Sequence, residues 1–315
     1  LGRLTQGQVI ALINYMSQIL VELIKLANLI ISVTKAMACF NRIQDVFHIE
    51  PSMKEGTKTV AAAGNTTPAV EFKNVSFTYA GGGDHAVENI SFKAMPGQTI
   101  GIIGGTGSGK STLVNLIPRF YDVTGGQITL DGKDIRRISM EELREEIGFV
   151  PQKGVLFSGT IASNLRFGKA DATDEDIKEA AEIAQATEFI ETKKEKYDSP
   201  IAQGGSNVSG GQKQRLAIAR AIAKKAKVLV FDDSFSALDM KTDAALRKEL
   251  NEKVQDASIV IVAQRVSTIL HADQILVLDD GKIVGKGTHK ELLKTCEVYK
   301  QIALSQLSKE ELENG

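Results

Sequence analysis

The feature that most constrains this chain is a glycine-rich stretch between an apolar run and a helical segment. Residues Thr99–Ile103 are typical of a buried strand, and Leu113–Phe120 are typical of a helix. In that context the pattern GxxxxGK, followed by Ser or Thr, predicts a loop that binds the phosphates of a nucleoside triphosphate, rather than a flexible Gly/Ser loop. The loop comprises Gly104, Gly105, Thr106, Gly107, Ser108, Gly109, Lys110, Ser111 and Thr112.

The residue types of this loop suit phosphate chemistry. Glycines let the backbone turn tightly and aim successive N–H groups inward, and the new helix adds the positive end of its dipole. Lys110 adds a full positive charge, and Ser111 is placed to offer its hydroxyl to Mg²⁺. This stretch predicts nucleotide binding, whereas hydrolysis depends on residues elsewhere in the chain.

Composition excludes some classes of partner. The chain has 315 residues and a formal net charge of −1, so it lacks the basic excess that a nucleic-acid partner requires. Its length favours about two domains. Cys39 and Cys296 lie far apart without a CxxC pattern, which indicates free thiols in a reducing compartment and neither a disulfide nor a zinc site.

The N-terminal region contains a long apolar segment, Val9–Val33. As a helix it would span roughly 37 Å at about 1.5 Å per residue. Its polar residues, which include Glu22 and Lys25, fall on one face of roughly 140° at about 100° per residue. The segment by itself fits equally well a membrane-spanning helix with a polar stripe on a translocation path and an amphipathic helix of a soluble domain. Lys35 and Arg42 follow it, as at a cytoplasmic end.

The rest of the chain alternates between strands and helices. The helix is expected to continue to about Phe47, and residues 48–68 have the composition of a linker. From there, strands alternate with helices, which predicts a mixed, mostly parallel α/β sheet with a helical region inserted into it. Expected strands cover residues 70–79, 88–93, 127–131, 147–150, 228–233, 258–263 and 274–279, and expected helices follow Thr173 and Ser139 as N-caps.

Two further motifs carry chemistry. The run Val228–Asp233 is an apolar strand that ends in acids, and beside a phosphate loop Asp232 can hold Mg²⁺ through water. A structural strand end is the alternative. The run Asn207–Gln212 combines a serine, two glycines and a helix start, which resembles a second phosphate-binding element. Since one nucleotide does not need two such elements, this run points to a dimer in which each chain completes its partner's site; a simple helix cap is the alternative.

These motifs occur in the order found in the ATPase domain of ABC transporters, which the chain resembles over about residues 69–308. The resemblance rests on the phosphate loop, Gln152 after Val150–Pro151, VSGGQ at 208–212, VFDD at 230–233 and SALD at 236–239. It implies a P-loop NTPase fold with a helical subdomain at about 153–225 and a tail at 309–315. Residues 1–47 resemble the last transmembrane helix of an ABC exporter half-transporter and its cytoplasmic extension, which favours the membrane-spanning interpretation.

The resemblance also implies roles for individual residues. Tyr79 resembles the aromatic on which adenine stacks, with a strand aromatic facing the core as its alternative. Ser111, Gln152 and Asp232 are implied as the Mg²⁺ site, and Gln152 as a relay of closure to the transmembrane part. The residues expected to act across a dimer interface are Ser209, Gly210, Gly211 and Gln212, which would contact ATP bound mainly to the partner, and Asp239.

Two positions depart from the family pattern. The residue after Asp232 is usually Glu, the base that polarises the attacking water, and here it is Asp233, which is one methylene shorter. The switch position usually holds His and here holds Gln264. Since this catalysis depends on positioning and electrostatics, both changes together indicate a catalytically weakened site. The chain therefore resembles the degenerate-site subunit of a heterodimeric multidrug-type ABC exporter.

The expected protein binds ATP and Mg²⁺ and works in the plasma membrane with its ATPase domain in the cytoplasm. It would pair with a second half-transporter, contact lipid and export a small or amphipathic molecule. Two alternatives stay open: a fully active ATPase half-transporter that works as a homodimer, and a soluble ABC ATPase without a transport role. Turnover of MgATP by the purified chain distinguishes the active homodimer from a weakened subunit. Membrane fractionation distinguishes a soluble ABC ATPase from a transporter.

Overall fold

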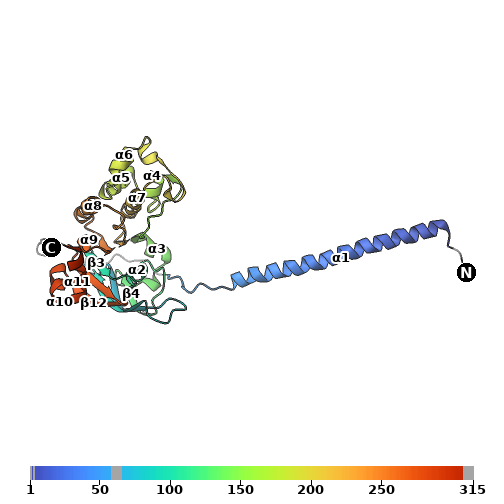
Figure 1. The fold of residues 1–315 in the computed structure, drawn as a ribbon, viewed down its shortest axis with the longest axis horizontal. Coiled ribbons are helices and arrows are strands. Elements are labelled where there is room, and N and C mark those ends of the chain that lie inside the picture. The colour runs from blue at the N-terminus through green and yellow to red at the C-terminus, as the bar shows by residue number, and fades with distance from the viewer. Residues whose placement is uncertain (1, 3, 58–65, 308–315) are drawn as a thin grey trace. The chain divides into compact units, whose positions relative to one another are not determined.

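The computed structural model describes residues 2, 4–57 and 66–307. The chain divides into two units, Leu1–Lys54 and Glu55–Gly315 (Figure 1). Part of the predicted linker, residues 58–65, and the whole predicted tail, residues 309–315, lie outside the described residues.

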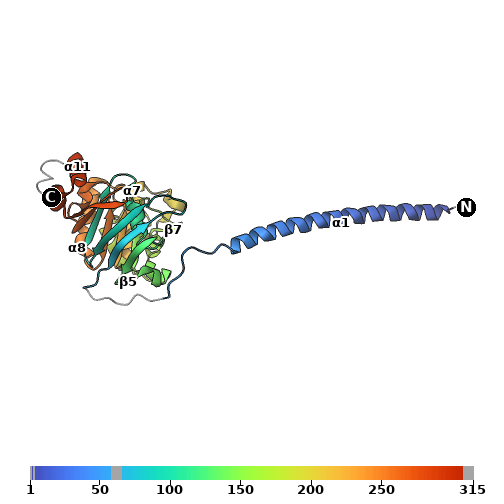
Figure 2. The ribbon, with the colours of Figure 1, turned by 90° about the horizontal axis from the view of Figure 1, so that it is seen from below.

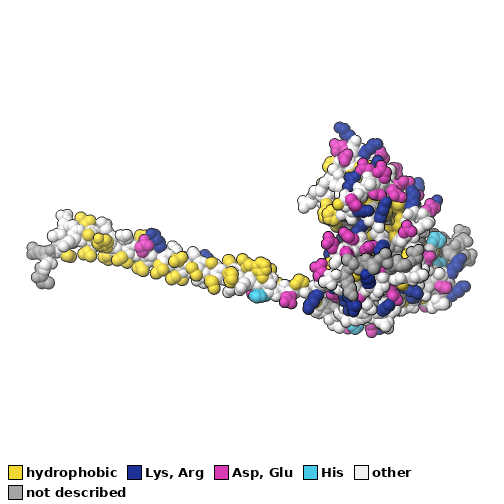
Figure 3. Space-filling model, turned by 180° about the vertical axis from the view of Figure 1, so that it is seen from behind, with side chains coloured by type: hydrophobic (Ala, Val, Ile, Leu, Met, Phe, Trp, Pro, Cys, Tyr) yellow, Lys and Arg dark blue, Asp and Glu magenta, His cyan; other side chains and the backbone are white. Residues whose placement is uncertain are grey.

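The first unit is one helix, α1, which spans Gln6–Phe47 and ends where the sequence predicts. None of the residues of α1 is buried, and hydrophobic side chains follow much of its length (Figure 3). Several of its polar side chains find partners on the helix itself. Ser17 Oγ donates to the Ile13 carbonyl at 3.0 Å, Thr34 Oγ1 donates to the Ile30 carbonyl at 2.8 Å, and Lys25 Nζ pairs with Glu22 Oε1 at 2.7 Å.

The second unit is built on a six-stranded sheet. Its strands run side by side (Figure 2), and all neighbours pair in parallel except β12, which pairs antiparallel with β11. In spatial order they are β12 (Lys282–Gly287), β11 (Gln274–Asp279), β3 (Thr99–Gly104), β10 (Ser258–Val262), β9 (Val228–Asp232) and β6 (Ile147–Val150). Every residue of β9 and β10 is buried, as expected of central parallel strands that are covered on both faces.

A second, antiparallel sheet packs against this one. Its order is β2 (Val87–Ala94), β1 (Val70–Phe77), β4 (Gly125–Leu130) and β5 (Lys133–Asp134). Alternate residues of β10 face two separate cores: Val260 and Val262 join the core shared with the antiparallel sheet, whereas Ile259 and Ile261 join the core shared with the helices. Because successive side chains of a strand point to opposite faces, one face of the central sheet packs on the antiparallel sheet and the other on the helices.

Helices fill the space around the sheets. The helices between β6 and β9, which are α4 to α7, gather in one region of the unit (Figure 1), together with the short pair β7 (Gly159–Thr160) and β8 (Pro200–Ile201). The helices are α2 (Lys110–Asn115), α3 (Met140–Glu145), α4 (Ile161–Arg166), α5 (Asp174–Ile183), α6 (Thr187–Glu191), α7 (Gly210–Ala223), α8 (Met240–Lys253), α9 (Val266–Ile269), α10 (His289–Thr295) and α11 (Glu297–Gln306). Short 3₁₀ turns cover Ile135–Arg137, Lys196–Asp198 and Gln203–Gly205.

The P-loop ATPase fold class that the sequence predicts is confirmed, with two corrections in detail. The first is that the helix expected at Leu113–Phe120 is α2, which begins at Lys110 and ends at Asn115. Pro118 has no N–H to continue the helix, and Arg119 takes a left-handed φ of 53°. The second is that β1, β2 and β4 form a separate antiparallel sheet and do not join the mostly parallel one.

Candidate functional site

The topology brings the predicted site residues to one edge of the six-stranded sheet. Strands β3, β10, β9 and β6 are consecutive neighbours and run parallel, so their carboxyl ends meet at this edge. The segments after them carry the phosphate loop, Gln264, the pair Asp232–Asp233 and Gln152, respectively. In open α/β sheets this edge is where ligands bind.

The phosphate loop has the conformation that its glycines permit. Gly107 and Gly109 have φ angles of 82° and 91°, and Gly109 is the N-cap of α2. Lys110 Nζ turns back over the loop and donates to the carbonyl oxygens of Gly104 at 2.9 Å and Gly105 at 2.6 Å. Burial lowers the pKa of Lys110, an effect that the nearby carboxylates oppose. The ammonium therefore lies over the loop, where the two carbonyl oxygens and, at 3.4 Å, Ser108 Oγ accept its hydrogen bonds.

Ser111 and Asp232 supply oxygen atoms suited to a divalent cation. Ser111 Oγ donates to Asp232 Oδ1 at 2.9 Å, and Asp232 is only 7% exposed. Burial raises the pKa of Asp232, and the charge of the neighbouring Asp233 adds to the effect. No group of three His, Cys, Asp or Glu side chains suited to a metal occurs in the described part of the chain. One carboxylate and one hydroxyl fit Mg²⁺, which usually takes one or two carboxylates together with substrate phosphates and water.

The acid that follows Asp232 sits at the centre of a small hydrogen-bond network. Asp233 is 6% exposed, has a left-handed φ of 48°, and donates its N–H to the Val262 carbonyl at 3.1 Å. Its Oδ2 accepts from Gln152 Nε2 at 3.0 Å and from Gln264 Nε2 at 2.6 Å. The structure thus brings together the three residues that the sequence marks as catalytic, and two amides fix the orientation of one carboxylate.

Tyr79 lies beside the phosphate loop and outside the strand. β1 ends at Phe77, and the Tyr79 side chain is accessible, with the residue 39% exposed. Its hydroxyl lies 3.1 Å from Thr112 Oγ1. T-shaped contacts place its ring beside Phe77, at a centroid distance of 4.8 Å, and beside Tyr121, at 5.3 Å. An aromatic ring that is open to solvent and packed among other aromatic rings suits stacking of a planar ligand. Sequence reasoning missed Tyr121.

The other predicted residues make local capping bonds instead of contacts with the phosphate loop. Ser209 is the N-cap of α7, where its Oγ accepts from the Gln212 N–H at 3.3 Å and its N–H donates to Gln212 Oε1 at 3.1 Å. Asp239 is the N-cap of α8 and accepts from the N–H and the hydroxyl of Thr242. Within the described ranges, no hydrogen bond or ion pair joins Ser209, Gly210, Gly211, Gln212 or Asp239 to the phosphate loop.

Sequence reasoning also missed Gln214, which holds the loop that carries Gln152. Gln214 lies on α7 and is only 2% exposed. Its Nε2 donates to the Pro151 carbonyl at 3.2 Å, and its Oε1 accepts from the Gly154 N–H at 2.8 Å. One side-chain amide therefore bonds the backbone on both sides of Gln152. A polar residue among the apolar positions of α7, next to Leu216 and Ala217, was the available signal.

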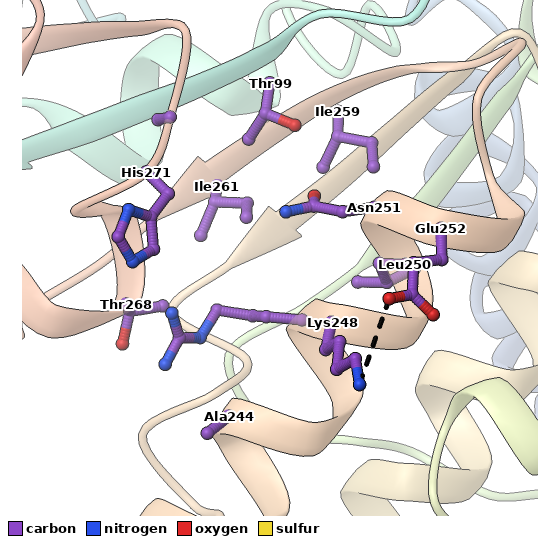
Figure 4. Close-up of a pocket in the computed structure, with 12 residues that line it drawn as sticks. Thr99, Ala244, Lys248, Leu250, Asn251, Glu252, Ile259, Ile261, Thr268 and His271 are labelled. Atoms are coloured by element: carbon purple, nitrogen blue, oxygen red, sulfur yellow. Dashed lines mark ion pairs between the residues drawn. The ribbon is translucent and has the colours of Figure 1, made fainter.

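A cavity of about 440 Å³ lies away from this site (Figure 4). It opens between α8, which contributes Leu250 and Asn251, and the start of β3 and β10 at Thr99 and Ile259. Thr99 begins the strand whose other end, Gly104, starts the phosphate loop. The cavity is therefore at the opposite edge of the sheet and contributes nothing to the phosphate site.

Known proteins are similar to this chain in sequence. A family model described as ABC transporter matches residues 87–236. An uncharacterized ABC transporter ATP-binding protein of Mycobacterium tuberculosis is 42% identical over 308 residues, which are 97% of this chain and 53% of that protein. An ATP-dependent lipid A-core flippase of Vibrio parahaemolyticus is 40% identical over 301 residues, which are 95% of this chain and 51% of the flippase.

A solved structure matches as well. The structure of a bacterial Atm1-family ABC exporter with ATP bound aligns with a TM-score of 0.86 and 31% identity over 98% of this chain and 54% of the exporter chain. The chain spans about half the length of the curated relatives it matches.

Proposed function

This chain carries an ABC transporter ATPase domain, and from that premise we propose that it is the ATP-binding part of one subunit of an exporter in a bacterial plasma membrane. Its own site binds MgATP and hydrolyses it slowly or not at all. Its Ser209–Gln212 segment completes the hydrolytic site of a second, different half-transporter. The hydrogen bonds of Asp233 are the single observation that carries this proposal.

The phosphate loop binds the triphosphate. Phosphate oxygens replace the carbonyls of Gly104 and Gly105 as acceptors for Lys110 Nζ, which satisfies a cation that burial now disfavours. Ser111, Asp232 and the amide oxygen of Gln152 would hold Mg²⁺, which would supply positive charge to the phosphate oxygens. Tyr79 supports the adenine. These roles are consistent with where the side chains lie.

The position of Asp233 is the reason to expect binding of ATP with slow hydrolysis at this site. Its carboxylate stands one methylene closer to the backbone than a glutamate would, and one of its oxygens already accepts two amide hydrogens. Gln264, unlike a histidine, cannot become a cation beside the γ-phosphate. A general base contributes typically 10²–10⁴-fold to a rate. A carboxylate with a shorter side chain, one of whose oxygens already accepts two hydrogen bonds, loses much of that factor.

The contrast between the weakened Asp233 site and the intact start of α7 supports a heterodimer. The capped, exposed start of α7 is intact, with Ser209 and Gln212 bonded to each other and not to the phosphate loop of the same chain. This segment can therefore contact ATP bound to a partner. The partner's own residue at the position of Asp233 would then act as the general base. ATP closes the two ATPase domains, and hydrolysis at the partner's site resets them.

The helix α1 supports membrane insertion. Among residues 2, 4–57 and 66–307 it is the one helix long and apolar enough to cross a membrane. The hydroxyls of Ser17 and Thr34 and the Glu22–Lys25 pair find partners within the helix, which lowers the cost of placing them in lipid or along a translocation path. The polar stripe suits a small, amphipathic export substrate.

Turnover by the purified chain tests the weakened site. We expect tight MgATP binding, turnover near the background of a Lys110→Ala control, and a gain of about 10²-fold or more after Asp233→Glu combined with Gln264→His in the assembled dimer. High turnover of the unchanged chain, abolished by Asp233→Asn, contradicts the proposal and supports an active homodimer.

Membrane fractionation tests the transporter assignment. We expect the chain to stay in the membrane pellet after an alkaline carbonate wash and to be released only by detergent. A variant that lacks residues 1–47 is the matched control and should be soluble. Recovery of the intact chain in the soluble fraction contradicts the transporter assignment and favours a soluble ABC ATPase.

A further inference from the structure

The switch loop that carries Gln264 lacks a cap of its own. Helix α9 begins at Val266, and its N-cap residue, Arg265, makes no side-chain capping bond. The first N–H groups of a helix need acceptors from outside the helix. The acceptor for the Val266 N–H comes from a residue far along the chain, at the end of α11.

Gln306 supplies that acceptor and a second bond. Its Oε1 accepts from the Val266 N–H at 2.8 Å, and its Nε2 donates to the Gln264 carbonyl at 2.9 Å. One planar amide thus bonds the backbone on both sides of Arg265. Gln264 in turn donates its own side-chain amide to Asp233 Oδ2 at 2.6 Å. A continuous chain of hydrogen bonds runs from α11 to the acid beside the nucleotide site.

We propose that Gln306 is a positioning residue that sets the switch loop and, through Gln264, orients Asp233. This inference rests on the proposed function of the same site, because it assigns a role in the use of ATP there. Nothing in the sequence near the phosphate loop identifies Gln306, which lies 40 residues or more from both of its partners.

Helix α11 is anchored firmly enough to hold the loop. Tyr299 and Ala303 are fully buried on its inner face, and the Tyr299 hydroxyl lies 2.7 Å from His289 Nδ1 of α10. The helix also packs against α9 and β12. Because its buried face is fixed, the amide of Gln306 reaches the switch loop from a rigid base.

The other glutamine that bonds Asp233 is held in the same way. Gln214 bonds the backbone on both sides of Gln152, as Gln306 does on both sides of Arg265. Both amides that fix Asp233 therefore sit on loops that a glutamine from a separate helix holds in place. The repeated arrangement supports a positioning role for Gln306, which is exposed whereas Gln214 is buried.

The test separates the two bonds of Gln306. Gln306→Ala removes both bonds, whereas Gln306→Glu keeps an acceptor for the Val266 N–H and loses the donor to the Gln264 carbonyl. Gln301→Ala is the matched control, since Gln301 is exposed on the same helix. Hydrogen exchange of the Val266 amide is measured in the whole chain in detergent, without nucleotide. We expect about two- to tenfold faster exchange for Gln306→Ala and little change for the other two.

A kinetic measurement checks the positioning role. It uses the chain with Asp233→Glu and Gln264→His in the assembled dimer, because Gln306 bonds the backbone at position 264 and not the side chain. Adding either Gln306 substitution should lower kcat for ATP about tenfold and leave KM within about twofold, at an unchanged Tm. Adding Gln301→Ala should change neither constant.

The outcomes separate this inference from the proposed function. Val266 exchange that is the same in Gln306→Ala and the unchanged chain overturns the inference, as does faster exchange spread evenly over the domain. An unchanged kcat overturns it as well. A dimer with Asp233→Glu and Gln264→His that hydrolyses no ATP contradicts the proposed function. Hydrogen exchange of the Val266 amide then tests the role of Gln306 by itself.

Discussion

Alanine at Gly104 should destabilise the ATPase domain far more than alanine at its neighbour Gly105. Gly104 ends β3 and pairs with Leu278 of β11. A methyl group at Gly104 would overlap the Leu278 carbonyl oxygen, lie 3.0 Å from the carbonyl carbon, and stand 2.8 Å from Ser108 Oγ. Backbone atoms in a central sheet cannot move aside as a flexible side chain can, so the strands themselves must separate.

The neighbouring glycines provide an internal scale. A methyl group at Gly105 meets nothing within 4 Å, and its φ is not left-handed. Gly107 also has open space, but its φ of 82° is left-handed, which costs a residue with a Cβ about 1–2 kcal/mol. Overpacking costs typically 1–3 kcal/mol, and the backbone overlap places Gly104→Ala at about 3 kcal/mol or above.

Thermal unfolding of the three variants measures this order. With a shift of about 2–4 °C per kcal/mol for a domain of this size, we expect Tm to fall by roughly 6–12 °C for Gly104→Ala and by roughly 2–8 °C for Gly107→Ala. Gly105→Ala should stay within about 1 °C of the unchanged chain. Equal losses at Gly104 and Gly105 would refute the reasoning, because only Gly104 faces backbone atoms.

Two further changes test buried charge. Burial lowers the pKa of His289, so neutral His289 stabilises the fold above the ordinary pKa of about 6.5, and this stabilisation is lost as pH falls through the lowered value. His289→Gln should therefore lessen the loss of urea resistance between pH 7.5 and 5.5. An unchanged loss contradicts this. Asp122→Ala removes the bidentate carboxylate of the buried Arg119 guanidinium and should cost about 1.5–3 kcal/mol in urea unfolding, since Asp122 is 30% exposed and Arg119 also donates to the Arg136 carbonyl. A cost below about 0.5 kcal/mol contradicts this.

Local patterns predict the parts of this structure that depend on local physics. The bounds of β6 and β11 agree with the prediction, because short apolar runs between turn residues specify buried strands. Thr173 caps α5 as expected, since a capping hydroxyl acts within one turn. The strand, glycine turn and following helix around the phosphate loop occur in the predicted order, because the spacing of the glycines specifies a tight turn there.

What the sequence does not predict depends on distant parts of the chain. Apolar alternation marks β1 as a strand but does not say that it leaves the parallel sheet for a separate antiparallel one. The contacts of Gln214 and Gln306 join residues that are 40 or more positions apart, and only packing decides them. The expected roles of Ser209 and Asp239 concern a partner chain and stay predictions.

Burial disfavours the charges of both Lys110 and Asp232 at the candidate site, which leads to a last prediction. Burial raises the pKa of Asp232, so ionised Asp232 costs stability at pH values above that raised pKa, and the cost disappears as pH falls below it. Mg²⁺ would offset this cost when MgATP binds. Asp232→Asn keeps an acceptor for Ser111 and removes the charge, so without ligand it should raise Tm at pH 7.5, by less as pH falls.

The same substitution should weaken the response to ligand. MgATP should raise the Tm of the unchanged chain more than that of Asp232→Asn, whereas ATP with excess EDTA should stabilise both chains about equally. Asp279→Asn, at the exposed end of β11, is the matched control and should behave as the unchanged chain does. A lower Tm for ligand-free Asp232→Asn would show that the carboxylate stabilises the fold. It would contradict the claim that the buried charge of Asp232 costs stability until ligand binds.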